Sequence, residues 1–487
     1  MLFNSLGFLI FFPIVTIAYF LLPHKVRWAF LLAASYFFYM CWNAAYALLL
    51  LSSTVVTYAG AIGIDRSRKR SAKKALLAAS LTVNLGILFI FKYFEFFTSG
   101  LYAVLDRLQI SYTPVAYSLL LPVGISFFTF QALGYAIDVY RGDVPVQKHF
   151  GKYALFVSFF PQLVAGPIER SRNLLPQFDE IHRFDDRNAV TGLRLMLWGY
   201  YKKIVIADTV CVAVNTVYNN ITAFDGFAIC IATFLFAIQI YCDFSGYSDI
   251  ARGCARIMGF RLMLNFDHPY FSHSVQEFWR RWHISLSTWF KDYIYIPLGG
   301  NRKGKARQYV NLMVTFLVSG LWHGANITFV VWGGIHGLFQ IVGQLTRRFR
   351  DRCFAWTEKA AVWRRLRGAS QMVLTFLLVC FAWIFFRANT MSDAVYAVTH
   401  LFDWQSLSAA YLFADLKMVF GTRAEFYRLL ATLPPFLLVS VIDRRRPLSR
   451  LADRAKPLVR WIAYVAAIIY ILLFARADMQ DFIYFQF

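Results

Sequence analysis

A histidine lies between two glycines in an otherwise apolar stretch, residues 317–337 (LVSGLWHGANITFVVWGGIHG). The imidazole of this residue, His323, changes its protonation near physiological pH and can therefore accept or donate a proton. Gly320 and Gly324 leave room for another backbone or a substrate to approach it. Because ionisable groups at membrane depth are costly and usually functional, we predict that His323 is the chemical centre. The alternative is a structural histidine that donates to a backbone carbonyl between helices.

An imidazole at depth is suited to taking a proton from a hydroxyl group as that group attacks an acyl carbon. Motifs for other chemistries are missing from the sequence. There is no H-x-x-x-H pair with a carboxylate for a metal, no G-x-S-x-G serine elbow, no phosphate-binding loop and no dinucleotide fingerprint. The sequence therefore indicates no metal site, no bound cofactor and no ATP- or NAD-dependent reaction.

Polar residues before this stretch are further candidates for the site. His283 lies at the border between the apolar and basic faces of a predicted helix, where a partly exposed interfacial histidine is the alternative. Arg280 and Arg281 could bind the phosphates of a cytoplasmic donor, although lipid headgroups would explain them equally well. Asp243 and Asp249 bracket FSGYS at the end of an apolar span. They could bind a cation, orient a histidine or cap the next helix.

Three residues near His323 complete the candidates. Trp322 and Asn326 belong to the same LWHGAN motif and are predicted, with Asp243 and the two arginines, to bind substrate. His336 follows thirteen residues after His323, also between glycines, and is predicted to be a packing or hydrogen-bonding residue.

The composition predicts what must position these residues. Of the 487 residues, 59% are hydrophobic and only 16% are charged, and nearly uncharged runs of 18 or more recur along the chain. This pattern is typical of a polytopic membrane protein. Residues 2–22 lack a preceding basic residue and a small-residue cleavage site, so they are predicted to be a retained span rather than a signal peptide. The seven cysteines are scattered without C-x-x-C spacing and indicate packing rather than disulfides or zinc.

The net charge of +23 comes from basic loops between the apolar runs. They lie at 66–74, 302–307, 347–367 and 444–460, whereas 390–428 is nearly balanced. The positive-inside rule predicts that the basic loops face the cytoplasm and anionic headgroups. This distribution argues against a nucleic-acid-binding protein.

Several apolar segments are too long, too short or too broken to be regular spans. Residues 28–64 are too long for one span, and Trp42 with Asn43 would divide them into two helices. Residues 153–168 are short and close on FFPQLVAGPIER, in which proline and glycine forbid a regular helix. Irregular backbone at membrane depth is tolerated only where protein or water satisfies it, so an internal cavity or tunnel is predicted.

Two further elements carry the candidate histidines. Residues 275–289 alternate at helical spacing, and this Trp- and Arg-rich segment is predicted to be an amphipathic helix in the interface plane. Residues 309–345 are flanked by basic loops on both sides, which fits a hairpin of two short helices turning at residues 320–324. The predicted fold is all-α, with about ten to twelve transmembrane or re-entrant helices around a tunnel.

Long blocks of the sequence resemble the membrane-bound O-acyltransferase family, in particular the bacterial branch typified by the alginate O-acetyltransferase membrane subunit. The strongest blocks lie at 159–178, 241–253, 265–304 (NFDHPYFSHSVQEFWRRWHISLSTWFKDYIYIPLGGNRKG) and 320–337 (GLWHGANITFVVWGGIHG). FFRAN at 385–389 and the terminal FIYFQF are weaker matches. The resemblance covers nearly the whole chain. It implies a single acyltransferase domain over 1–487, with a core at about 115–345.

The resemblance implies that His323 in LWHGAN is the principal catalytic histidine and that His283 in RRWHISLS is the second. It also implies that the two face one another in a tunnel, with a thioester donor such as acetyl-CoA entering from the cytoplasm and a hydroxyl acceptor from the other side. The implied function is transfer of an acyl group, most simply acetyl, across the bacterial inner membrane to an extracytoplasmic polysaccharide of the alginate type or another exopolysaccharide.

The same resemblance implies a periplasmic SGNH-type acetyltransferase partner within a polysaccharide biosynthesis machinery. Three alternatives stay open at this point. One is a family member of the D-alanyl-transfer type that acts on teichoic acid. The second, from a different functional class, is a proton-coupled transporter or flippase in which His323 relays protons. The third is a scaffold that only recruits a periplasmic enzyme.

Overall fold

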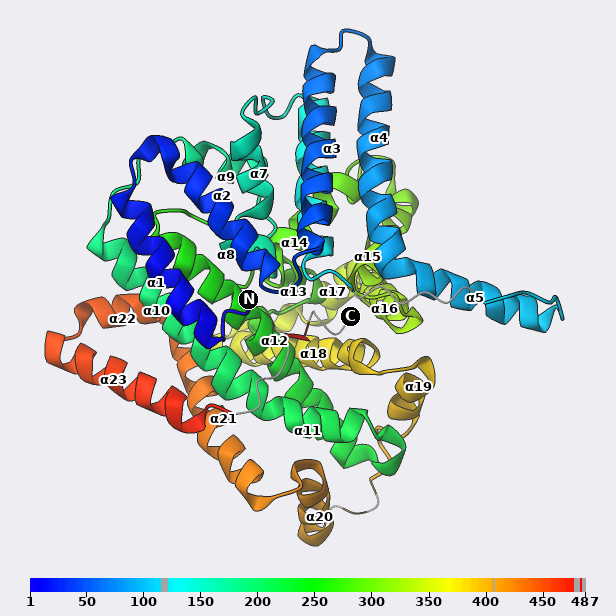
Figure 1. Ribbon diagram of the computed structural model, residues 1–487. Coiled ribbons are helices and arrows are strands. Elements are labelled where there is room, and N and C mark those ends of the chain that lie inside the picture. The colour runs from blue at the N-terminus through cyan, green and yellow to red at the C-terminus, as the bar shows by residue number, and fades with distance from the viewer. Residues whose placement is uncertain (115–120, 405, 407, 477–481, 484–487) are drawn as a thin grey trace. The chain divides into compact units, whose positions relative to one another are not determined.

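The computed structural model describes residues 1–114, 121–404, 406, 408–476 and 482–483 (Figure 1). The residues it describes form α-helices joined by short 3₁₀ and π turns, with no β-strand among them, which confirms the all-α prediction. Within this part of the chain, seven helical stretches are long and apolar enough to cross a membrane. They are α3 (Tyr46–Arg66), α4 to α5 (Arg70–Arg107), α12 (Gly226–Ile257), α16 (Ile327–Leu345), α18 (Ala361–Arg387), α21 (Arg423–Arg445) and α23 (Pro457–Phe474).

The chain forms two compact units. The first comprises residues 1–196 and 250–263, and the second comprises residues 197–249 and 264–487. All seven residues predicted to form the site belong to the second unit. Residues 115–120, at the start of the predicted core, lie outside the described residues, as does most of the terminal FIYFQF.

The first unit begins with helices that follow the predicted apolar runs. α1 (Leu6–Leu21) is followed by α2 (His24–Met40), and the chain breaks at Trp42 and Asn43 before α3 begins, as predicted. α3 and α4 (Arg70–Leu88) lie side by side (Figure 1). A π turn, η1 (Phe89–Tyr93), joins α4 to α5 (Phe94–Arg107), and α6 (Ile125–Arg141) packs against α3 and α4.

The Pro/Gly-rich segment of the first unit is irregular, as predicted. α7 (Phe150–Ser158) and the single turn α8 (Phe160–Leu163) are followed by non-helical residues up to α9 (Ser171–Leu174) and the 3₁₀ turn η2 (Pro176–Phe178). Side chains supply hydrogen bonds to the backbone where the helix breaks. The side-chain amides of Gln131 and Gln162 both donate to the Phe156 carbonyl, at 2.6 and 2.8 Å. Burial raises the pKa of Glu169 to about 8, and its carboxylate accepts from the Met263 N–H at 2.5 Å.

The second unit begins near the end of α10 (Asp186–Tyr200) and contains the π turn η3 (Tyr201–Ala207), α11 (Asp208–Tyr218) and the part of α12 up to Asp249. α12 continues through YCDFSGYSDIARG to Ile257, so the prediction that the span ends within this polar sequence is wrong. The helix continues because its acidic residues are paired. Lys202 Nζ lies 2.7 Å from Asp249, and Lys203 Nζ lies 2.8 Å from Asp208 and 2.9 Å from Asp243.

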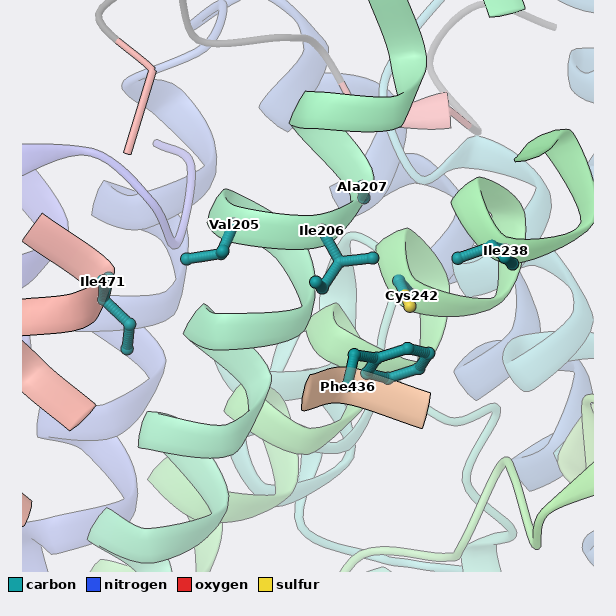
Figure 2. Packing of buried hydrophobic residues seen from close by; sticks show 7 residues of the cluster. All are labelled: Val205, Ile206, Ala207, Ile238, Cys242, Phe436 and Ile471. Atoms are coloured by element: carbon teal, nitrogen blue, oxygen red, sulfur yellow. The ribbon is translucent and has the colours of Figure 1, made fainter. Parts of the chain in front are cut away.

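Apolar side chains from four segments pack together in this unit (Figure 2). The cluster consists of Val205, Ile206 and Ala207 from η3, Ile238 and Cys242 from α12, Phe436 from α21 and Ile471 from α23. Burial of this apolar surface stabilises the π turn that presents both lysines, at roughly 25 cal/mol per Å² buried.

The predicted amphipathic helix is interrupted, which corrects the expectation of a single element. α13 (Val275–Arg281) and α14 (Ile284–Phe290) are separate helices, and a π turn, η6 (Lys291–Tyr295), follows. The break lies at His283, whose backbone is left-handed, with φ 42° and ψ 55°. Bulky residues rarely adopt this conformation, so the surrounding structure must hold it.

The predicted helical hairpin is present. α15 (Lys305–His323) and α16 are each 19 residues, about 28 Å, and thus longer than expected. The turn falls at residues 324–326 rather than at 320–324. α16 packs against α13 and α18, and seven further short elements complete the described part of the unit. They are η4 (Ile221–Ala223), η5 (Pro269–Phe271), α17 (Arg347–Cys353), η7 (Ala355–Lys359), α19 (Met391–Thr399), α20 (Ala409–Phe420) and α22 (Leu448–Arg454).

Glycines allow the two hairpin helices to touch. A Cβ atom added at Gly333 would lie 2.2 Å from the Phe316 carbonyl oxygen, whereas one at Gly334 would meet only a Leu317 methyl group at 3.5 Å. We expect Gly333→Ala to destabilise the protein by about 1–3 kcal/mol, because relieving the contact requires a shift of helix backbone rather than of a flexible side chain. Gly334→Ala is the matched control. Thermal unfolding of both variants in detergent tests this, and equal unfolding temperatures would contradict the packing described.

A second prediction concerns pH. His268 Nε2 lies 3.0 Å from Asp443 Oδ2, and this hydrogen bond raises the pKa of His268 above 6.5, with Asp267 acting in the same direction and partial burial opposing it. The stabilisation of the folded protein by this hydrogen bond is complete below the pKa of His268 in the unfolded chain. It is lost as pH rises through the raised pKa of His268 in the folded protein. The unfolding temperature should therefore fall more steeply above pH 6.5 in wild type than in His268→Gln. Parallel pH profiles would refute this.

Candidate active site

His323 is the last residue of α15 and is 3% exposed. Its ring centroid lies 5.0 Å from that of Trp332 on α16 and 5.4 Å from that of Phe386 on α18, each nearly edge-on. Gly324 follows in extended conformation, and a Cβ atom there would collide with the Phe329 ring at 2.1 Å. The imidazole is therefore enclosed by aromatic rings from three helices.

His283 is fully buried and lies near the same indole as His323. Its ring centroid lies 6.1 Å from that of Trp322, and the Trp322 centroid lies 4.9 Å from that of His323. Phe244 on α12 also contacts His283, at 4.6 Å between ring centroids. The structure thus brings the two predicted histidines to the same aromatic cluster.

The strained backbone of His283 is held by Asn265, a fully buried residue that sequence reasoning missed. The Asn265 carbonyl accepts from the Ile284 N–H at 2.9 Å, and its side-chain oxygen accepts from the Ser285 hydroxyl at 2.6 Å. Its amide donates to Ser248 on α12 at 3.0 Å. A single asparagine in an apolar run has no periodicity, so only the contacts reveal this role.

Asp243 belongs to an ion-pair network rather than to the imidazole cluster. One carboxylate oxygen pairs with Lys203, and the other accepts from the Ile483 N–H at 2.7 Å. The adjacent Phe244 contacts both His283 and Phe482. Asp243 thereby connects α12 to residues near the end of the chain, and its predicted role in substrate binding stays a prediction.

The remaining predicted residues differ in their surroundings. Asn326 caps α16, because its side-chain oxygen accepts from the Thr328 N–H at 3.0 Å. Arg280 is exposed, whereas Arg281 pairs with Glu277 at 2.9 Å and lies 3.6 Å from Asp267. Of the two arginines, Arg280 is exposed and unpaired with these acids, whereas Arg281 is partly exposed.

The side chains that surround the two histidines are mostly apolar and aromatic. A neutral imidazole is a proton acceptor, and burial among aromatic rings removes these two from bulk solvent. The arrangement suits proton transfer during attack on an acyl carbon.

The chain was compared with known proteins. Residues 146–387 match the model of the membrane-bound O-acyltransferase family. A protein of Pseudomonas syringae pv. tomato described as probable alginate O-acetylase AlgI is 40% identical over 447 residues, covering 88% of this chain and 82% of that protein. A protein of Pseudomonas putida with the same description is 36% identical, and the match covers all of both chains.

A third relative has a different description. The peptidoglycan O-acetyltransferase of Helicobacter pylori is 33% identical over 446 residues, covering 85% of this chain and 82% of that protein. Together with the seven apolar helical stretches, these similarities identify a multi-pass membrane enzyme that transfers acyl groups. The chain belongs to the membrane-bound O-acyltransferase family.

Proposed function

We propose that this protein transfers an acetyl group from a cytoplasmic thioester, acetyl-CoA in the simplest case, across the bacterial inner membrane for O-acetylation of an extracytoplasmic polysaccharide. The observation that carries the proposal is the pair of buried imidazoles, His283 and His323, which both lie close to the Trp322 ring. The relatives described as alginate O-acetylase and peptidoglycan O-acetyltransferase support an acetyl group and a glycan acceptor. The final acceptor is reached through a periplasmic SGNH-type transferase partner.

In the proposed reaction His323 accepts the proton of the acceptor hydroxyl as its oxygen attacks the acetyl carbonyl carbon. The new C–O bond forms, the C–S bond breaks, and the proton passes from His323 to the departing thiolate. His283 positions the donor carbonyl or the acceptor, and the exposed Arg280 binds the phosphates of the donor at the surface. A tunnel through the membrane core gives donor and acceptor access from opposite sides.

Family membership favours transfer over the transporter alternative, because a flippase requires no acyl donor. It does not separate acetyl from D-alanyl transfer, which use different donors. Supplying purified protein with radiolabelled acetyl-CoA or with a D-alanyl-loaded carrier protein distinguishes the two. Acetyl release or transfer with the first donor only is expected.

We predict that His323→Ala lowers acetyl transfer by about 100-fold or more, because it removes the proposed general base. Transfer is measured with purified protein in nanodiscs, at matched amounts in the membrane. His273→Ala replaces an exposed histidine of the same unit and should retain activity. Full transfer by a well-folded His323→Ala protein would refute the assignment.

Asn265→Ala tests whether the His283 backbone must be held. The variant loses the side-chain contacts to Ser285 and Ser248 and should lower kcat by roughly tenfold, because a small misplacement of a catalytic group is costly. Asn265→Asp keeps the acceptor for Ser285 and should retain more activity than Asn265→Ala. If both variants turn over like wild type, Asn265 does not position His283.

A further inference from the structure

α16 places polar groups on its buried face and apolar groups outside. Thr328, Trp332 and His336 are spaced four residues apart, which puts them on one helix face, and all three are fully buried. The exposed large residues of the helix are apolar. They are Ile327, Leu338, Val342 and Leu345. Lipid contact explains the apolar outer face, but it does not explain the polar inner one.

Each of the three buried residues has a polar atom that lacks a hydrogen-bond partner among the described residues. These atoms are the Thr328 hydroxyl oxygen, Trp332 Nε1 and His336 Nε2. A buried polar group left without a partner is destabilising, so several on one face of one helix need an explanation.

The contacts of His336 determine which kind of partner it needs. Trp279 Nε1 donates to His336 Nδ1 at 3.2 Å. Since Nδ1 accepts, the neutral ring carries its proton on Nε2, which is therefore a donor. Trp332 Nε1 is also only a donor. Both groups thus require an acceptor, such as a carbonyl oxygen.

These donors lie beside the proposed catalytic base. The Trp332 ring centroid lies 5.0 Å from that of His323 and also 5.0 Å from that of His336. From Trp332 to His336 the helix rises by one turn, about 6 Å. A molecule with carbonyl groups at intervals along an extended arm would match donors placed in this way.

We propose that Trp332 and His336 bind carbonyl oxygens of the acyl donor, a thioester on an amide-containing arm, and so hold its acyl carbon next to His323. Trp279 fixes the tautomer of His336 and is a positioning residue. This inference rests on the proposed function and deepens it, since it assigns the donor to the buried face of α16.

The test is equilibrium binding of acetonyl-CoA, a thioether analogue that cannot transfer its acyl group, to the full chain in nanodiscs. Trp332→Phe and His336→Phe keep an aromatic ring but remove the N–H, and each should weaken binding about tenfold. His336→Gln restores an N–H donor and should bind within about threefold of wild type. Leu338→Ala, on the exposed face of the same helix, is the control and should bind normally.

A structural role would give a different result. If His336→Gln bound as poorly as His336→Phe, or if both phenylalanine variants bound like wild type, the inference would be overturned. Thermal unfolding identifies variants that do not fold. Trp279→Phe removes the N–H that fixes the tautomer of His336 and provides an independent test. It should weaken binding of the analogue by less than His336→Phe does. If short-chain phosphatidylglycerol bound to these N–H donors and the analogue did not, the donors would be assigned to a lipid ester. That result would also overturn the inference.

Failure of the proposed function is distinguishable. Wild-type protein that binds the analogue but transfers no acetyl group from acetyl-CoA would contradict the function while leaving the donor-binding residues assigned. Wild-type protein that transfers acetyl groups without any contribution of Trp332 or His336 to donor binding would contradict only this inference.

Discussion

The close contact between α15 and α16 is the constraint on which the site depends. A Cβ atom at Gly320 would lie 2.2 Å from the Phe329 carbonyl oxygen, and Gly333 meets the Phe316 carbonyl in the same way. Only glycine lets the helix backbones approach so closely. This approach places the end of α15, where His323 lies, against the inner face of α16, where Trp332 lies. Without it, the imidazole would lose the aromatic enclosure that excludes water.

Buried charge provides a second constraint in the same unit. Lys203 lies between Asp208 and Asp243, and all three side chains are almost fully buried. Removing one partner from such a group typically costs about 3–5 kcal/mol, because it leaves a buried charge uncompensated. The network fixes the register of α12 against the π turn η3. Since Phe244 follows Asp243 on α12, the same register sets the ring that contacts His283.

His283 shows how strain and support occur together. Its left-handed backbone separates α13 from α14, and Asn265 and Ser285 hold the chain in this conformation. A straight amphipathic helix would have placed His283 at the edge of the basic face. The break instead turns it into the protein, against Phe244 and Trp322.

Hydrophobic run length, charge placement and glycine spacing were sufficient to predict an all-α membrane protein, the break near Trp42 and the hairpin around His323. These are local properties, because each depends on residues near one another in the chain. What only the tertiary structure decided is which polar groups become partners. Lys203 pairs with Asp243 across 40 positions, Asn265 supports the backbone after His283, and Trp279 donates to His336. Such pairings follow from the packing of distant helices, and a buried polar residue carries no periodic signal of its own.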